Sequence, residues 1–448
     1  MKNLFSLLFL GSFIACAAQA QVAVTIYNND LAVVRDVRPI EFEKGRQTVR
    51  FTQVAARIDP TSVHFKPMNE SEPIRLLEQN YEFDLVNSDA LMRRYLNQMV
   101  VASLKEGPTL TGTLLSNQGS VLILERSDGR VVTINPAQIS SIEYPALPQG
   151  LITEPTLVWL VNSDTEGQKE CEISYITHGM NWQAEYVAVV NKEDTRLDLG
   201  AWVSIENESG ATFENAQLKL VAGDVHVVRD QPPSPRLMRE FATQAMEERD
   251  TFQEKSFFEY HLYTLPRKTT LSDKQIKQIS LFPETRTGVE KIYTYEGQRD
   301  AENVQVALEF ENRKENGLGI ALPKGRFRVY KRDDDGAQEF IGEDRIDHTP
   351  KDEKIRLRIG NAFDIVGERV VKERDQLSRT SVRQTIEITL RNHKETSVKV
   401  VVVERHWGDW ELVGETPTIL DKDANKVEFL EQVPADGETV LRYTVISR

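Results

Sequence analysis

The residues of this chain best suited to recognise a ligand lie near its C-terminal end. His406, Trp407 and Trp410 stand close together in the run HWGDWE. Exposed tryptophans stack on sugar rings, so this spacing is compatible with a carbohydrate-binding surface. Two tryptophans packed in the core at the end of a strand would give the same pattern. We expect core packing and keep His406, Trp407 and Trp410 as candidate binding residues.

Motifs for metal binding or catalysis are incomplete. Residues 421–425 (DKDAN) open like a calcium loop, but that loop needs Gly at position six and Glu at position twelve. This chain has Lys426 and Gln432 there, so a β-turn is predicted. The seven histidines show no ligand spacing, and no GxSxG elbow or glycine-rich phosphate loop occurs. We therefore expect no metal and no cofactor, and we assign no catalytic residue. A site assembled from distant residues stays open.

The first twenty residues have the pattern of a signal peptide. Lys2 precedes an apolar run over residues 4–14, and Ala18-Gln19-Ala20 forms a small-x-small cleavage site. Cleavage after Ala20 predicts export to the periplasm or the extracellular space. A lipid anchor at Cys16 is an alternative, although Phe13 stands where a lipoprotein signal usually has a branched aliphatic residue. No later segment has about 18 continuous apolar residues, so we expect no transmembrane helix.

The charge and the cysteine content argue against a nucleic-acid-binding protein and against a fold held by disulfides. The 448 residues carry a formal net charge of −14, which argues against nucleic-acid binding because phosphate neutralisation needs clustered Lys and Arg. Signal cleavage would leave Cys171 as the sole cysteine, so no intramolecular disulfide is expected. Glu170 and Glu172 flank this residue and disfavour its thiolate, which predicts an unreactive residue in a strand.

The segment over residues 175–225 has the clearest pattern for secondary structure. Apolar residues alternate with polar or small ones over 197–205, which places five apolar side chains on one face of a strand. Residues 207–210 (NESG) break the alternation as a turn does, and it resumes at Leu218. We interpret Trp182, Trp202 and Phe213 in this segment as structural residues.

The same patterns predict a mainly β protein with two immunoglobulin-like β-sandwich units. Strands of the first unit are expected over residues 21–88 and its main part over 148–229. A helix and five short strands over 89–147 resemble a small Sm/SH3-like barrel, with few basic residues and no aromatic row for base stacking. Prolines and mixed charges predict a helical or mobile connector over 230–259. The second sandwich is expected over 260–448.

Several separated segments resemble one bacterial family. They are NWQAEY at 181–186, LDLGAWVSIENESGATFENAQLKLVAGDV at 197–225, EYHLYTLPRKTTL at 259–271, ITLRNHKETSVKVVVVERHWGDWELV at 388–413 and VPADGETVLRYTV at 433–445. In this order they resemble the domain-of-unknown-function family numbered 4139, whose members are often labelled mucoidy-inhibitor-like. Many relatives carry an N-terminal coiled-coil hairpin, which is replaced here by the small-barrel segment. The resemblance implies an exported β-rich protein with no assigned reaction.

Taken together, these observations predict a non-enzymatic protein of the cell envelope that binds or scaffolds other molecules through sandwich surfaces. Its partner, an envelope protein or a glycan, is not identified by the sequence, and its oligomeric state stays open. Nucleic acid is not expected as a partner. Two alternatives remain, namely carbohydrate binding through Trp407 and Trp410 and a hydrolase whose site is assembled in space.

Overall fold

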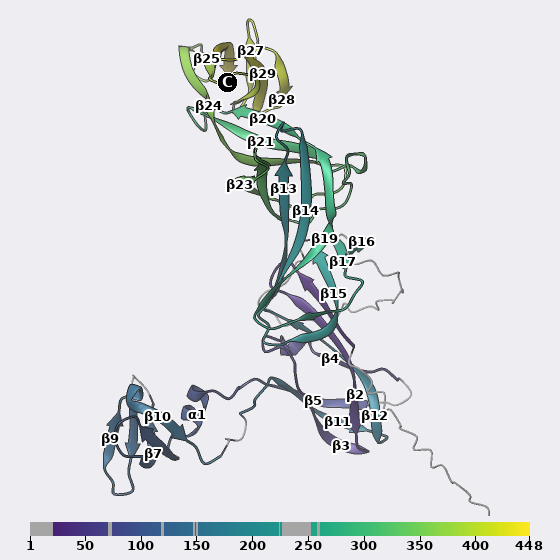
Figure 1. The fold of residues 1–448 in the computed structure, drawn as a ribbon, viewed down its shortest axis with the longest axis vertical. Helices are drawn as coiled ribbons and strands as arrows, with labels where there is room; N and C mark the ends of the chain where they lie inside the picture. The colour runs from purple at the N-terminus through teal and green to yellow at the C-terminus, as the bar shows by residue number, and fades with distance from the viewer. Residues whose placement is uncertain are drawn as a thin grey trace, which may run out of the picture.

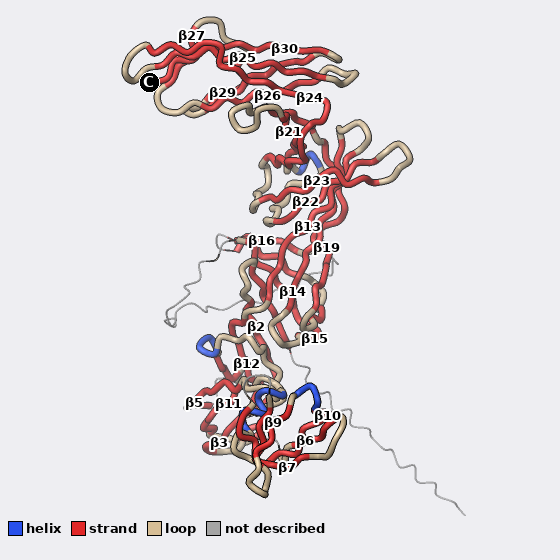
Figure 2. Tube along the Cα trace, turned by 90° about the vertical axis from the view of Figure 1, so that its left-hand side faces the viewer, coloured by secondary structure: helices blue, strands red, loops and turns tan. Residues whose placement is uncertain are grey.

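The computed structural model describes residues 21–69, 74–117, 121–146, 148, 151–223, 225, 252–257 and 260–448. Strands make up 64% of these residues and helices 4%, so the protein is mainly β, as predicted. The sheets follow one another along a long axis, and one small sheet stands off to the side (Figures 1 and 2). The predicted signal peptide over 1–20, with Cys16, lies outside the described residues, and so does most of the predicted connector over 230–259.

Three sheets, together with Leu308, Phe310, Ile355 and Leu357 from the C-terminal sheet, enclose the largest apolar core. The first has the order β16-β17-β15-β1-β2-β12-β4, with β18 beside β15. The second has the order β3-β11-β5 and the third the order β19-β14-β13-β22-β23. Their bounds are β1 Gln21–Tyr27, β2 Ala32–Phe42, β3 Gly45–Phe51, β4 His64–Pro67, β5 Ile74–Glu82, β11 Thr156–Ser163, β12 Gly167–Thr177, β13 Met180–Val190, β14 Arg196–Asn207, β15 Phe213–Ala222, β16 Gln253–Phe257, β17 Tyr260–Thr264, β18 Thr269–Leu271, β19 Gln275–Gly288, β22 Gly325–Arg332 and β23 Gln338–Ile346.

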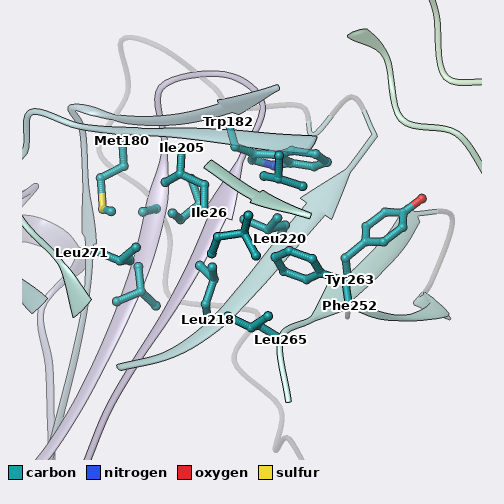
Figure 3. Close-up of a cluster of buried hydrophobic side chains, with 14 of the residues drawn as sticks. Ile26, Met180, Trp182, Ile205, Leu218, Leu220, Phe252, Tyr263, Leu265 and Leu271 are labelled. Carbon is teal, nitrogen blue, oxygen red and sulfur yellow. The ribbon is translucent and has the colours of Figure 1, made fainter. Parts of the chain in front are cut away.

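The alternation over 197–205 produces the expected strand, β14, with its five apolar side chains buried. Trp182 and Phe213 are buried as predicted, and the Trp182 indole Nε1 donates to the Val221 carbonyl at 3.2 Å. Figure 3 shows Trp182 gathered with Leu220 and Tyr263 in this core. Trp202 differs, because it lies on the polar face of the alternation and is 45% exposed. Its interpretation as a structural residue therefore stays a prediction.

The third sheet spans the boundary that we placed between residues 229 and 260. Strand β22 pairs in parallel with β13, and Phe327 on β22 stacks on Tyr186 of β13 with ring centroids 4.3 Å apart. Within the predicted connector, residues 253–257 form strand β16, which pairs with β17. The large core therefore continues from the N-terminal strands into the segment that we assigned to the second unit.

Residues 88–143 form a small unit with an apolar cluster of its own. Helix α1 (Ser88–Arg94) is capped by Asn87, whose side-chain oxygen accepts from the Ala90 N–H at 2.8 Å. Five strands follow in the order β10-β6-β7-β8-β9. Their bounds are β6 Met99–Leu104, β7 Leu110–Ser116, β8 Leu122–Glu125, β9 Val131–Ile134 and β10 Ile139–Glu143. The edge strands β9 and β10 do not pair among the described residues, so the sheet is open and the predicted closed barrel does not form.

The C-terminal sheet has nine strands in the order β27-β30-β25-β24-β21-β20-β26-β29-β28. Strand β24 is 23 residues long; its first half pairs with β21 and its second half with β25. The two arms of the sheet therefore fold toward each other around a shared apolar cluster (Figure 2). The bounds are β20 Glu290–Tyr295, β21 Asn303–Glu311, β24 Lys354–Gln376, β25 Val382–Asn392, β26 Val398–Arg405, β27 Trp410–Val413, β28 Ile419–Lys422, β29 Lys426–Val433 and β30 Gly437–Ser447.

Candidate functional site

The predicted binding residues lie in and beside the short connection between β26 and β27. His406 is buried, Trp410 is half-buried and Trp407 is 75% exposed. Core packing, which we expected for both tryptophans, is therefore wrong for Trp407. The exposed indole presents a large apolar surface to solvent, which a ligand could cover.

Trp410 is held in place on several sides. Its indole Nε1 donates a 2.6 Å hydrogen bond to the Ala424 carbonyl. The Lys422 ammonium lies 4.5 Å from the centroid of its ring, a cation–π distance. On another side the His406 ring lies 4.9 Å away, centroid to centroid. The Trp410 ring is therefore fixed in position, and one of its faces already forms a cation–π interaction with Lys422.

Residues 421–425, which resembled a calcium loop, form the end of β28 and the turn at 423–425 that leads into β29. The Asp423 carboxylate accepts hydrogen bonds from the backbone N–H groups of Asn425 and Lys426 at 2.7 and 2.9 Å. These bonds lower the pKa of Asp423. The predicted β-turn is thus formed, and it is this turn that Trp410 binds through Ala424. In the part of the chain that the structure describes, no group of three His, Cys, Asp or Glu residues is placed to hold a metal ion.

A buried polar network lies beneath the aromatic residues. Glu404, with no exposed surface, accepts two hydrogen bonds from Arg369 Nε at 3.0 Å and one from Arg369 Nη2 at 2.9 Å. The Tyr443 hydroxyl donates to the same carboxylate and lies 3.4 Å from His406 Nε2. The network therefore joins strands β24, β26 and β30 at one end of the folded sheet.

Burial and the neighbouring arginine set the protonation of this network. Burial and, to a lesser extent, the nearby Arg369 cation together lower the pKa of His406 to about 4. Burial and the Glu404 charge raise the pKa of the Tyr443 hydroxyl well above its ordinary value. Burial alone would lower the pKa of Arg369, but its bonds to Glu404 raise it instead. At neutral pH His406 is therefore uncharged and Arg369 keeps its positive charge.

The network of Arg369, Glu404, Tyr443 and His406 stabilises the sheet, and its carboxylate does not reach the surface, where it could act in acid–base catalysis. The Glu404 carboxylate is sealed from solvent and already accepts four hydrogen bonds. A buried pair of this kind fixes the geometry of the strands that carry it, and each partner is costly to remove. What reaches solvent here is the indole of Trp407 and part of Trp410, so the site is suited to binding.

Cys171 lies on β12, outside the C-terminal sheet that carries this network. Cys171 is fully buried on β12, and burial, together with the nearby Glu170, raises the pKa of its thiol to about 12. A thiol of this kind stays protonated at physiological pH and is a poor nucleophile. Its predicted place in a strand is confirmed, and its low reactivity stays a prediction.

The sequence model of one protein family matches more than half of the chain. The sequence model of the family described as "Domain of unknown function (DUF4139)" matches residues 171–406. The chain belongs to this family. The DUF4139 match runs from β12 to His406, so it includes Glu404 and Arg369, whereas Trp407 and Trp410 follow its end. A search of curated proteins finds no match.

The structure also identifies residues that the sequence did not single out. Arg356 and Arg358 line a groove on the C-terminal sheet close to the turn that binds Trp410. No sequence motif marks them, because the strands that complete the groove are distant in the chain.

In the described part of the chain, no helix is long and apolar enough to cross a bilayer.

Proposed function

We propose that this DUF4139 protein is an exported protein of the cell envelope that binds and scaffolds other molecules through the surfaces of its β-sheets. The observation that carries the proposal is the extended arrangement of five sheets around three separate apolar clusters (Figure 1). Such a shape spreads surface over a long axis, which suits a protein that contacts several partners. The signal-like residues 1–20 support export.

The proposal includes a finer description of the fold. We take the large core and the folded nine-stranded sheet as immunoglobulin-like β-sandwiches, since in each case sheet faces enclose one apolar cluster. We take the small five-stranded sheet as an open relative of the Sm/SH3-like fold. Its order supports this, because the last strand, β10, lies beside the first, β6.

The test is crosslinking in the native envelope followed by reconstitution of each recovered partner with purified protein. The matched variant replaces residues 89–147 with a short Gly/Ser linker. The ends are close enough to join, since the Val86 N–H donates to the Ile152 carbonyl at 2.9 Å. We expect stoichiometric partners for the whole protein and loss of a subset in the variant. Turnover on a broad hydrolase panel, abolished by one substitution, would overturn the proposal, and so would a mature protein that retains residues 1–20 in the cytoplasm.

A second candidate function, carbohydrate binding, is favoured by the exposure of Trp407. The solvent-facing indole of Trp407, three residues before the half-buried Trp410, offers an apolar face for a sugar ring. We expect Trp407→Ala to abolish binding on a glycan array, while Trp202→Ala, an exposed indole on another sheet, leaves it unchanged. A blank array for the unaltered protein would remove this candidate.

A further inference from the structure

A groove of about 490 Å³ lies on the face of the nine-stranded sheet that points away from its apolar cluster. Small side chains form its floor, namely Thr294 on β20, Ala307 on β21 and Val403 on β26. Charged side chains from β24, β26 and β29 surround this floor. The volume lies within the range of small-ligand sites.

The positive charges around the groove fall into two classes. Arg405 is neutralised by Glu296 at 2.5 Å, and Lys426 by Glu428 at 2.7 Å. Arg356 donates instead to the Thr294 hydroxyl at 2.6 Å and has no ion pair among the described residues. Arg358 likewise forms no ion pair with a described residue. Two adjacent guanidinium groups on β24 are therefore available to an anion, and guanidinium binds carboxylates with two parallel hydrogen bonds.

The groove and the exposed tryptophan share one structural element. Asp423 and Asn425, from the turn between β28 and β29, line the groove. The intervening Ala424 accepts the indole hydrogen bond of Trp410. Arg405 also lines the groove and is two residues before Trp407. The aromatic surface and the arginines therefore lie on either side of the same turn.

We infer that this combined surface binds an acidic oligosaccharide, whose carboxylates pair with Arg356 and Arg358 while a sugar ring stacks on Trp407. The inference rests on the carbohydrate binding proposed above as a second candidate function, and it specifies that the carbohydrate is negatively charged. An acidic peptide fits the geometry less well. Peptides that bind sheets commonly add to a free edge, but β21, β20 and β26 beneath the groove are each paired on both sides.

The test compares one sugar chain in charged and neutral forms. Calorimetry with the mature protein, residues 21–448, would use hexagalacturonate and its methyl ester, which keeps the rings and removes the charge. We expect the acid to bind at least about tenfold more tightly, because hydrogen bonds to charged groups contribute more than neutral ones. The double variant Arg356→Gln/Arg358→Gln should remove this preference. The control Arg374→Gln/Arg379→Gln changes two exposed arginines of the same C-terminal region and should bind like the unaltered protein.

The outcomes separate the inference from the function on which it rests. Trp407→Ala should weaken the acid and the ester by a similar factor, whereas the arginine variant should weaken the acid alone. Equal binding of acid and ester would overturn the inference and leave carbohydrate binding intact. Binding of neither would remove both. Equally tight binding of hexaglutamate would show a general anion site and overturn the choice of a saccharide. Unchanged melting temperatures would establish that the variants are folded.

Discussion

His406 should make the C-terminal sheet sensitive to acid. The imidazole is buried beneath Trp410, with Arg369 close enough to disfavour a second positive charge. These two effects hold its pKa at about 4 in the folded protein, against an ordinary value of 6.5. In the unfolded chain the same ring takes up a proton as the pH falls through 6.5.

The sign and the size of the effect follow from this difference. Between pH 6.5 and about 4, His406 is protonated in the unfolded state and unprotonated in the folded state. The free energy of unfolding therefore falls as the pH falls. A difference of about 2.5 pKa units corresponds to about 3 kcal/mol at 1.36 kcal/mol per unit. Most of this loss should be complete at pH 4.5, and none of it should be present above pH 7.5.

The assay is urea unfolding at pH 7.5 and pH 4.5 for the unaltered protein and for His406→Gln. Carboxylates also titrate in this range, so the informative quantity is the difference between the two proteins in their loss of stability. We expect His406→Gln to lose about 2–3 kcal/mol less than the unaltered protein. His393→Gln, a change at an exposed histidine, should behave like the unaltered protein. An imidazole that titrates near pH 6.5 by NMR, or equal losses in both proteins, would refute the reasoning.

Three further predictions concern backbone, charge and thiol chemistry. Gly210 and Gly336 both have a left-handed φ, +80° and +85°, but a Cβ on Gly210 would lie 2.5 Å from another side chain, whereas a Cβ on Gly336 would meet open space. Gly210→Val should therefore lower the free energy of unfolding in urea by about 1–3 kcal/mol more than Gly336→Val does. Equal losses of stability would show that the contact is absent. Glu404→Gln leaves a buried arginine without its counter-charge and should lower stability by about 3–5 kcal/mol; a melting temperature within error of the unaltered protein would contradict the network. Cys171 should resist maleimide at pH 7.5 until urea is added, and rapid labelling of the folded protein would show an open strand.

Local pattern was enough to predict the strand class and several turns. The period of two over 197–205 determines which face of β14 is buried, because side chains of a strand alternate between its faces. The same alternation placed Trp202 among the polar positions, so its exposure was visible in the sequence. The turn that ends at Gly210 was also predictable, since its left-handed φ suits glycine.

Pairing between distant strands was not predictable from these patterns. Apolar and charged residues alternate over residues 354–359 (KIRLRI), a pattern typical of a strand. Strand β24, however, continues to Gln376 and changes its partner from β21 to β25 on the way. Likewise, no local signal shows that β22 pairs with β13 across more than a hundred residues. Our domain boundaries followed composition along the chain, whereas the sheets are built from segments on both sides of them.

The candidate site illustrates how the same limit applies to function. Trp407 and Trp410 could be named because an aromatic cluster is visible in six consecutive letters. Arg356 and Arg358 could not, because many exposed arginines among the described residues have carboxylate partners. An arginine without one is recognised only when the strands around it have been placed. Four strands and one turn bring these arginines to the tryptophans. Residue type therefore suggests the sugar ring, but only the order of strands in the sheet suggests that the sugar is acidic.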